Sequence, residues 1–280
     1  MSKKGKSNSS SGAHAPDERN IEYNEGKLHD VISSLRDLVS EEKKLKVRKD
    51  DSFMLRYLRA SDFRPKEAFE KMVKVYKFKA KHEKYFCSKS PSEYKELLSQ
   101  NFITILEDRD ETGRRLILAK LGDIDTNKTS VMECVRLNDL WMELAMDEEE
   151  TQKNGIAIIL DLGGLPMRLF KFLTPKVTII SALKEEMRPW KKIDIHVVNT
   201  SSLLDKLVSI VYPLLGSGIK QHIHFHGQDW TSVHKFIPPE VLPEEYGGYK
   251  PQVDFPKMHK YLYDNEDKLM ELFSLGYVKS

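Results

Sequence analysis

The sequence predicts an α/β protein that begins with an all-helical unit, and three observations lead to this prediction. The first 100 residues place their apolar side chains at helical spacing. From residue 102 onward, short apolar runs alternate with helical patterns, which is typical of βαβ units and a twisted, mainly parallel sheet. The run 155–162, GIAIILDL, is apolar almost throughout, as expected of a strand buried on both faces of such a sheet.

The helical unit is expected over residues 26–100. Residues 1–25, rich in Ser, Gly and Lys, predict a disordered tail before it. Pro65 is placed to begin a long helix in its first turn, and Asp51 or Ser52 to cap the helix before it. The predicted helices of this unit span 27–42, 53–60, the stretch that begins at Pro65, and 92–98.

An α/β unit that closes with a C-terminal helix is expected over residues 101–280. Its first two strands are joined by a turn containing Gly113. The predicted strands span 102–107, 115–121, 155–162, 193–199 and 222–227. The predicted helices span 130–149, 175–187, 201–215 and 257–273.

Composition bounds the class of protein. Apolar residues make up 40% of the 280 residues and charged residues 31%, so we expect a real core and a water-exposed surface. No apolar run approaches the ~20 residues that cross a bilayer, and no secretory or myristoylation signal is visible. Cys87 and Cys134 lack metal or redox spacing, which favours buried thiols in the cytoplasm. No cofactor is expected.

The formal net charge is +2, with the positive excess in the first 100 residues. A basic region of this kind suits acidic lipid, or it is simply a set of solvated helix faces. No nucleic-acid-binding motif accompanies it, so a nucleic-acid partner is not expected.

The predicted helix 201–215 is unusually apolar. Its apolar face covers roughly 160° of the helical wheel, wider than the ~100° stripe of an ordinary surface helix. Pro213 interrupts the helix near its end, and Gly216 and Gly218 follow it. Two interpretations fit this pattern: a buried crossover helix of a βαβ unit, or a mobile cover over an apolar cavity.

Two features raise the question of catalysis. His222, His224 and His226 alternate along a strand and would share one face, as zinc ligands can. No fourth ligand or general base accompanies them, and the other interpretation is a strand whose histidines face solvent or neighbouring side chains. Asp161 ends a strand, but no phosphate-binding or nucleophile motif follows, so it is equally suited to capping a turn. We therefore expect neither an enzyme, nor catalytic residues, nor a metal site.

Several motifs in order along the chain resemble the CRAL-TRIO lipid-transfer family. FMLRYLRASDFRPKEAF resembles its N-terminal helical signature, and GIAIILDLGGL its central strand and turn. NTSSLLDKLVSIVYPLLGSGIKQHIHFHG resembles its gate helix and following strand, and VLPEEYGGYK its closing motif. The resemblance runs from about residue 27 to residue 273 and is closest to the branch of the α-tocopherol transfer and retinaldehyde-binding proteins.

The resemblance implies a carrier without enzymatic activity. Such proteins enclose one hydrophobic lipid, such as a tocopherol, retinoid or carotenoid, and open a gate helix at a membrane surface. We accordingly expect a monomer that is cytoplasmic and transiently at membranes. The alternative is a phosphoinositide-sensing module that binds membranes and carries no small lipid.

The resemblance also implies a set of cavity-lining residues, and ordinary core packing is the alternative for each. Asn138 is the most informative of them, because a polar group on an apolar helix face is suited to orient a ligand hydroxyl or to bind backbone. The expected ligand-binding residues are Leu121, Val135, Asn138, Met142, Ile156, Leu160, Leu165, Ile180, Leu183, Trp190, Leu207 and Val211.

Basic residues that hold phosphoinositide headgroups in relatives are implied near the gate. The sequence departs from the family pattern at Ile193 and His222, where a basic residue is expected, so weaker or pH-sensitive headgroup binding is an alternative. The expected headgroup residues are Arg56, Arg59, Arg188, Lys191, Lys192 and Lys220.

Overall fold

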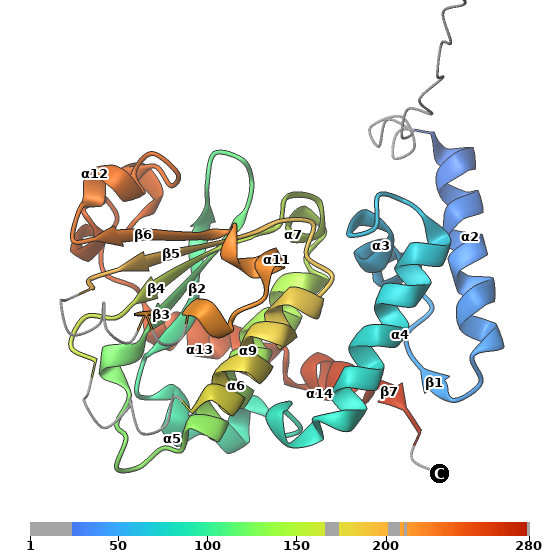
Figure 1. Cartoon of the computed structure of the whole chain (residues 1–280), viewed down its shortest axis with the longest axis horizontal. Helices are drawn as coiled ribbons and strands as arrows, with labels where there is room; N and C mark the ends of the chain where they lie inside the picture. Colours follow the sequence, from blue (N-terminus) through green and yellow to red (C-terminus); the bar gives the residue numbers. More distant parts are fainter. Residues whose placement is uncertain (1–23, 166–173, 201–207, 210–211, 279–280) are drawn as a thin grey trace, which may run out of the picture.

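The computed structural model describes residues 24–165, 174–200, 208–209 and 212–278. Figure 1 shows a sheet with helices packed on it, and a further group of helices beside it that includes the start of the described chain. The predicted tail falls almost wholly outside the described residues, and so does most of the predicted helix 201–215.

The central sheet has five strands in the order β2-β3-β4-β5-β6. Strand β2 is antiparallel to β3, and the remaining neighbours are parallel, which confirms the predicted mainly parallel sheet. The strands span Ile103–Arg109 (β2), Arg115–Lys120 (β3), Ile156–Asp161 (β4), Ile193–Val198 (β5) and Ile223–Gly227 (β6).

Alternate residues of each strand point to opposite faces, and both faces of the central strands are covered. On one face, Ile117 and Ile156 pack in a core with the helix α6 (Val131–Asp147). On the other face, Leu118 and Ile159 pack with the short helix α12 (Trp230–Val233) and the segment after it. This two-sided burial explains why the run GIAIILDL is apolar at every position but Asp161.

Helices α6 and α9 (Pro175–Met187) lie close together on the first face of the sheet (Figure 1). Ser130 and Glu133 form a capping box at the start of α6, which satisfies backbone N–H groups that have no partner inside the helix. Thr174 caps α9, and Pro175 occupies its first turn, where no N–H is needed. The short helix α7 (Glu149–Asn154) follows α6.

The N-terminal helices pack around Leu35, Phe53 and Met72. They span Glu25–Glu41 (α2), Asp51–Arg59 (α3) and Pro65–Lys81 (α4). Asp50, rather than Asp51 or Ser52, caps α3 by accepting a hydrogen bond from the Phe53 N–H at 3.1 Å. The predicted helix 92–98 is a 3₁₀ turn, η2 (Pro91–Tyr94), followed by one α-helical turn, α5 (Lys95–Leu98). Another 3₁₀ turn, η1 (Glu83–Tyr85), precedes them.

The predicted C-terminal helix 257–273 is two helices, α13 (Phe255–Asp264) and α14 (Glu266–Ser274). They separate at Asn265, whose side chain donates to the Tyr261 carbonyl at 2.8 Å. Strand β7 (Gly276–Tyr277) then pairs antiparallel with β1 (Leu45–Lys46), and Leu272 joins the N-terminal core. The end of the chain therefore packs with its first helices, a contact between distant segments that local patterns did not predict.

Short elements complete the described chain. They span Leu121–Asp123 (η3), Tyr212–Leu214 (η4), Ser217–Lys220 (α11), Pro239–Val241 (η5) and Glu244–Tyr246 (η6). Gly247 and Gly248 follow η6, and a Cβ at Gly248 would lie 2.0 Å from the Leu242 carbonyl oxygen. That contact accounts for a glycine in the closing motif. Among the described helices, none has the length and apolar character needed to cross a bilayer.

Candidate functional site

A large cavity of about 410 Å³ lies between the sheet and the helices α6 and α9. This volume falls in the range of ~300–1,000 Å³ typical of small-molecule sites. Its lining is overwhelmingly aliphatic and aromatic, with a few polar side chains. Such a hollow stays open only where the surrounding elements hold each other apart, because an ordinary protein core is close-packed.

The floor of the cavity consists of two apolar rows that cross the parallel strands. Register pairs residues directly across the strands, so each row contains one residue from each of four strands. The rows are Ile117, Ile158, Ile195 and Ile223, followed by Ala119, Leu160, Val197 and Phe225. All eight line the cavity.

The walls come from α6 and α9. Val131, Val135, Asn138 and Met142 recur at spacings of three or four residues, which places them on one face of α6. Val177, Thr178, Ser181, Ala182 and Glu185 form a matching face of α9. Both helices therefore present a continuous stripe to the cavity.

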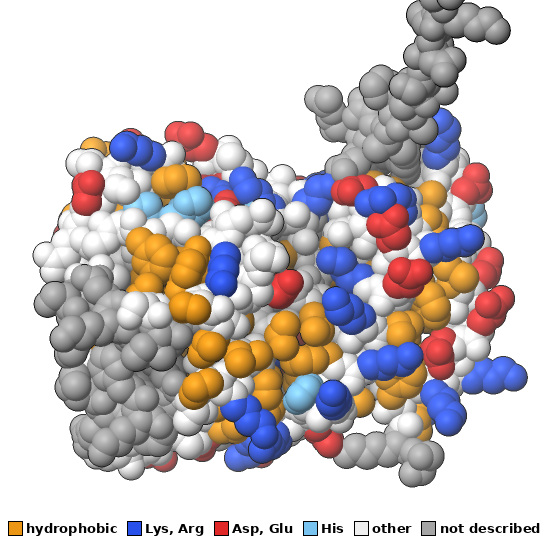
Figure 2. Space-filling view, in the orientation of Figure 1, with side chains coloured by type: hydrophobic (Ala, Val, Ile, Leu, Met, Phe, Trp, Pro, Cys, Tyr) orange, Lys and Arg blue, Asp and Glu red, His pale blue; other side chains and the backbone are white. Residues whose placement is uncertain are grey.

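The mouth of the cavity is lined by the segment between β5 and β6. Val208, Tyr212, Leu215 and Ile219 are the described lining residues of this segment. Phe225, in the edge strand β6, both lines the cavity and is 46% exposed. In Figure 2 hydrophobic side chains gather on this side of the molecule, beside β6 and over α9. The apolar interior thus continues onto the surface.

The structure brings five of the expected ligand-binding residues to the cavity. They are Leu121, Val135, Asn138, Met142 and Leu160. That these residues contact a ligand stays a prediction. Leu207 and Val211 lie outside the described residues, although Val208 between them lines the cavity.

The other five expected residues are not among those that line the cavity. Ile156 shares a face with Leu160, but it lies at the start of β4, where the core is solidly packed and the side chain is fully buried. Ile180 and Leu183 lie on a different face of α9, against Phe78 of α4. Trp190 packs in the main core beside α6, and Leu165 packs against Leu162 and Val197.

Several lining residues were missed by sequence reasoning, chiefly those of β3, β5 and β6. A signal for them was present, because alternate residues of a strand share one face of the sheet. Once Leu160 is placed on the cavity face, its neighbours across the strands, Ala119, Val197 and Phe225, fall on the same face. Thr178, Ser181 and Glu185 were missed because polar residues on a helix usually indicate its solvated face.

Two polar side chains meet inside the apolar cavity. The Asn138 side-chain N–H donates to Glu185 Oε1 at 3.0 Å. The same oxygen accepts a hydrogen bond from Arg188 Nε at 3.2 Å. Asn138 therefore binds a side chain of α9 rather than backbone, and it fixes the orientation of the Glu185 carboxylate.

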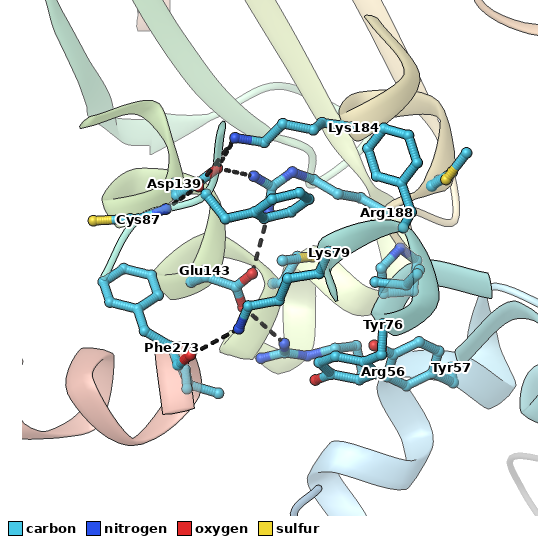
Figure 3. A pocket seen from close by; sticks show the side chains of 17 residues that line it. Arg56, Tyr57, Tyr76, Lys79, Cys87, Asp139, Glu143, Lys184, Arg188 and Phe273 are labelled. Atoms are coloured by element: carbon cyan, nitrogen blue, oxygen red, sulfur yellow. Dashed lines mark hydrogen bonds and ion pairs between the residues drawn. The ribbon is translucent and has the colours of Figure 1, made fainter. Parts of the chain in front are cut away.

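Behind α6 and α9 lies a layer of buried ion pairs around a small void of about 40 Å³ (Figure 3). Asp139 accepts from Arg188 and from Lys184, whose Nζ lies 2.8 Å from Asp139 Oδ1. Glu143 bridges Arg188 and Arg56, each at 3.2 Å. Burial lowers the pKa of Lys184, and the charge of Asp139 opposes this shift.

Three of the basic residues expected to hold headgroups are buried in ion pairs, and headgroup binding by them stays a prediction. Arg56 is 2% exposed and also contacts Asp147 at 2.9 Å, while Arg188 belongs to the layer just described. Arg59 is 5% exposed and donates to Gln152 at 2.7 Å and Glu149 at 3.2 Å. A headgroup could reach these guanidinium groups only if buried ion pairs were broken, which is costly.

The remaining three lysines are nearer the surface. Lys191 pairs with Asp62 at 2.9 Å, and Lys192 lies 3.4 Å from Asp194 with a half-exposed side chain. Lys220 donates to the Pro213 carbonyl at 3.1 Å and lies over the Tyr212 ring at the cavity mouth. Headgroup binding by these three stays a prediction.

His224 and His226 of β6, and His222 just before it, lie on the face of the sheet that points away from the cavity. His226 Nε2 is 3.0 Å from His196 Nδ1, and His226 Nδ1 is 2.7 Å from Ser232 Oγ. His222 and His224 each approach Asp194 Oδ1, at 3.4 and 3.5 Å. Across the described ranges, no three His, Cys, Asp or Glu side chains are arranged to hold a metal ion.

Asp161 acts as a structural hub at the end of β4. Its Oδ1 accepts from the Gly163 N–H at 2.8 Å and from Asn199 Nδ2 at 2.9 Å. Its Oδ2 accepts from the Tyr246 hydroxyl at 2.8 Å, and burial raises the pKa of Tyr246. The carboxylate is thus occupied by the turn and by the closing motif, as the capping interpretation expected.

The sheet, its helices and the apolar hollow define an α/β protein of the hydrophobic-ligand-binding class. The family model described as the CRAL/TRIO domain matches residues 99–248, and the model of the CRAL/TRIO N-terminal domain matches residues 27–74. The chain therefore belongs to the CRAL/TRIO family, whose members bind or transfer hydrophobic ligands.

Similar proteins support the same assignment. Clavesin-1 of Xenopus laevis is 29% identical over 241 residues, which cover 84% of this chain and 72% of the relative. The human protein named alpha-tocopherol transfer protein-like is 29% identical over 252 residues, covering 89% and 73%. The crystal structure of Sfh5 superposes with a TM-score of 0.55 at 9% identity, covering 92% of this chain and 99% of that chain, which shows the shared fold.

Proposed function

We propose that this protein binds one bulky hydrophobic lipid in the cavity and carries it between membranes. The cavity of about 410 Å³ with its two apolar rows and two helical walls is the observation that carries the proposal. The name of a relative, alpha-tocopherol transfer protein-like, is consistent with cargo of this kind. A tocopherol, a retinoid or a carotenoid has suitable chemistry.

Burial of the lipid supplies the binding free energy. Removing apolar surface from water stabilises by about 25 cal/mol per Å², so roughly 400 Å² of lipid surface contributes up to about 10 kcal/mol. The loss of translational and rotational freedom on association offsets part of this. A cavity whose lining is mostly apolar retains most of the gain.

Exposed apolar side chains at the mouth support exchange at a membrane surface. Phe225 is 46% exposed and Leu214 38% exposed, and the Tyr212 ring packs edge-on against Phe225. A contiguous apolar rim is unfavourable in water and favourable at a lipid interface. The rim therefore supports transient binding at membranes, and a cytoplasmic monomer is part of the same proposal. The full set of hydrogen bonds on Asp161 supports binding rather than catalysis.

The test is a transfer assay with a variant that fills the cavity. Leu160→Trp adds bulk to the floor, and we expect at least a tenfold loss in affinity for a fluorescent tocopherol or retinoid. Leu55→Trp is the matched control, because Leu55 is also partly buried but packs among the N-terminal helices. Wild-type protein and Leu55→Trp should transfer lipid between vesicles, whereas Leu160→Trp should not. Equal transfer by folded Leu160→Trp and wild-type protein would contradict lipid binding in this cavity.

A second candidate is phosphoinositide sensing by Lys220 at the mouth and by the half-exposed Lys192. Lys220 overlies Tyr212 of the cavity lining, and Lys192 lies 3.4 Å from Asp194, which His222 also approaches. Flotation with vesicles that contain or lack phosphoinositide, comparing wild-type protein with the double variant Lys192→Gln, Lys220→Gln, tests this candidate. Equal flotation with and without phosphoinositide would contradict this candidate and leave apolar contacts at the cavity as the basis for membrane binding.

A further inference from the structure

Three oxygen atoms on α9 are buried without a hydrogen-bond partner. They are Thr178 Oγ1, Ser181 Oγ and Glu185 Oε2. All three residues line the large cavity. A buried polar atom without a partner is destabilising and uncommon in native proteins, so three on one helix face call for an explanation.

Their spacing places the three side chains in a single row. Residues three and four apart on a helix are neighbours on its surface, and Thr178, Ser181 and Glu185 follow this spacing. The row is about 10 Å long, because each residue of a helix advances 1.5 Å. The row lies on the wall that α9 contributes to the cavity.

Glu185 gives this row its chemical preference. Its Oε1 already accepts two hydrogen bonds, from Asn138 Nδ2 at 3.0 Å and from Arg188 Nε at 3.2 Å. Arg188 is itself held by Glu143 and Asp139, so the carboxylate is anchored from behind. The remaining oxygen, Oε2, is an acceptor that needs a donor, and no donor among the described side chains supplies one.

We propose that the guest lipid supplies this donor: Glu185 Oε2 accepts a hydrogen bond from a hydroxyl group at one end of the lipid. This inference rests on the proposed lipid-binding function and narrows its ligand class to lipid alcohols and phenols. The hydroxyl groups of Ser181 and Thr178 can each donate or accept, so they can hydrogen-bond to the same lipid hydroxyl or to a second oxygen of the lipid. The rest of the lipid lies over the apolar rows of the floor.

The same arrangement disfavours other lipid classes. A hydrocarbon or an ether leaves the Glu185 acceptor unpaired after water is excluded, at the cost of that lost hydrogen bond. A fatty or retinoid carboxylate would bring a second negative charge to Glu185 in a poorly solvated site. The nearby cations do not offset this, because Lys184 and Arg188 already bind Asp139 and Arg188 also pairs with Glu185.

The first test uses wild-type protein and matched lipid pairs. Retinol and α-tocopherol are each compared with their methyl ethers, which keep the oxygen but lack the donor hydrogen. We expect each alcohol that binds to bind about tenfold more tightly than its ether, which corresponds to one hydrogen bond to a charged acceptor. Equal affinities within a pair would overturn the inference, although they would leave lipid binding itself intact.

The second test is Glu185→Gln, which exchanges an acceptor for a donor. Asn138 and Arg188 both donate, so they hold the carbonyl oxygen of the new amide and leave its NH₂ group facing the cavity. We expect the alcohol-to-ether affinity ratio to fall about tenfold, because an ether oxygen can accept from this group. Glu186→Gln, at the adjacent exposed position, is the matched control and should keep the wild-type ratio. An unchanged ratio in Glu185→Gln would contradict the inference.

Two further measurements test the inference if Glu185→Gln folds poorly or if the natural ligand is a different lipid. Ser181→Ala removes one hydroxyl without disturbing the ion pairs, and it should weaken alcohol binding more than ether binding. Mass spectrometry of lipid extracted from the full-length protein, isolated from eukaryotic cells, should recover a lipid with a free hydroxyl. Recovery of a hydrocarbon, ester or acid would overturn this inference alone. If no lipid is recovered and no probe binds, the proposed function fails, and this inference fails with it.

Discussion

Adjacent residues of α6 and α9 face two very different spaces. Asn138 and Glu185 meet in the apolar cavity, whereas their chain neighbours Asp139 and Lys184 meet in the buried ionic layer of Figure 3. In the ionic layer, carboxylates and cations of three helices are directly paired around a void of about 40 Å³. In the cavity of about 410 Å³, three polar oxygens of α9 have no partner.

The two faces of α6 and α9 therefore have different roles: one stabilises the fold and the other lines the candidate binding site. The carboxylates of the ionic layer are paired with its cations, although Arg56 Nε has no partner among the described residues, and these pairs fix α9 against α6 and α3. The cavity side is incomplete without a guest, so it is the side where binding takes place. A binding cavity stays open while empty only if the helices that line it are held rigidly from the other side, and the ionic layer does this for α6 and α9.

The largest expected effect comes from breaking the ionic layer. Asp139→Ala removes the carboxylate shared by Lys184 and Arg188 and leaves both cations buried without it. We expect a loss of about 3–5 kcal/mol in the free energy of unfolding, as for other broken buried ion pairs. Urea denaturation measures it. Asp264→Ala, which breaks an exposed pair with Lys260, is the control and should cost less than about 1 kcal/mol.

A second pair of variants compares packed core with cavity floor on one face of the sheet. Ile156 and Ile195 lie on neighbouring strands, but Ile156 is fully buried in the core, whereas Ile195 lines the cavity. Ile156→Ala should destabilise by about 2–5 kcal/mol, because it creates a new void in a close-packed region.

Ile195→Ala should cost distinctly less than Ile156→Ala, because its side chain already borders open space. Its main effect should be weaker lipid binding. Thermal unfolding of both variants, with and without lipid, measures the contrast. Similar losses for the two variants in lipid-free protein would show that the cavity floor is packed like the core.

The smallest expected effect concerns pH and His196 of β5, on the face of the sheet opposite the cavity. Burial, followed by the charge of His226, lowers the pKa of His196 to about 3. In the unfolded chain a histidine titrates near 6.5, so between these values the unfolded state binds a proton that the folded state does not. Stability is therefore fully present above about pH 6.5 and is lost as pH falls toward 3, by about 1.4 kcal/mol per pH unit for one proton.

Chemical denaturation at pH 7 and pH 5 measures this dependence. His196→Gln should flatten it, because glutamine does not titrate. His29→Gln, at an exposed position of α2, should leave it unchanged. A wild-type slope in His196→Gln would assign the acid sensitivity to other groups.

Much of the fold was predictable because its signals are local. Pro65 marks the start of α4, the bounds of α9 are those that the pattern predicts, and the run GIAIILDL indicates a doubly buried strand. The exceptions are long-range or subtle: the pairing of Leu45 with Tyr277, and the break at Asn265 between α13 and α14.

The candidate site was predictable only in part, for a different reason. Leu160 and Met142 follow from helix and strand periodicity together with the family resemblance, and both line the cavity. Ile156 fits the same periodicity and lies in solid core, because periodicity gives the face of an element but not the depth at which packing ends. Arg56 and Arg188 are basic in sequence, but burial pairs them with acids far along the chain.

The sequence by itself determined the order of helices and strands, their periodicity and the family, because these depend on neighbours within a few residues. Tertiary structure alone decided where the sheet and helices leave a hollow, which polar atoms are unpaired in it, and which charges cancel behind it. Those properties arise from contacts such as Asn138 with Glu185 and Asp139 with Lys184, between residues more than 40 positions apart. Register and packing fix such contacts, and neither can be obtained from one local segment.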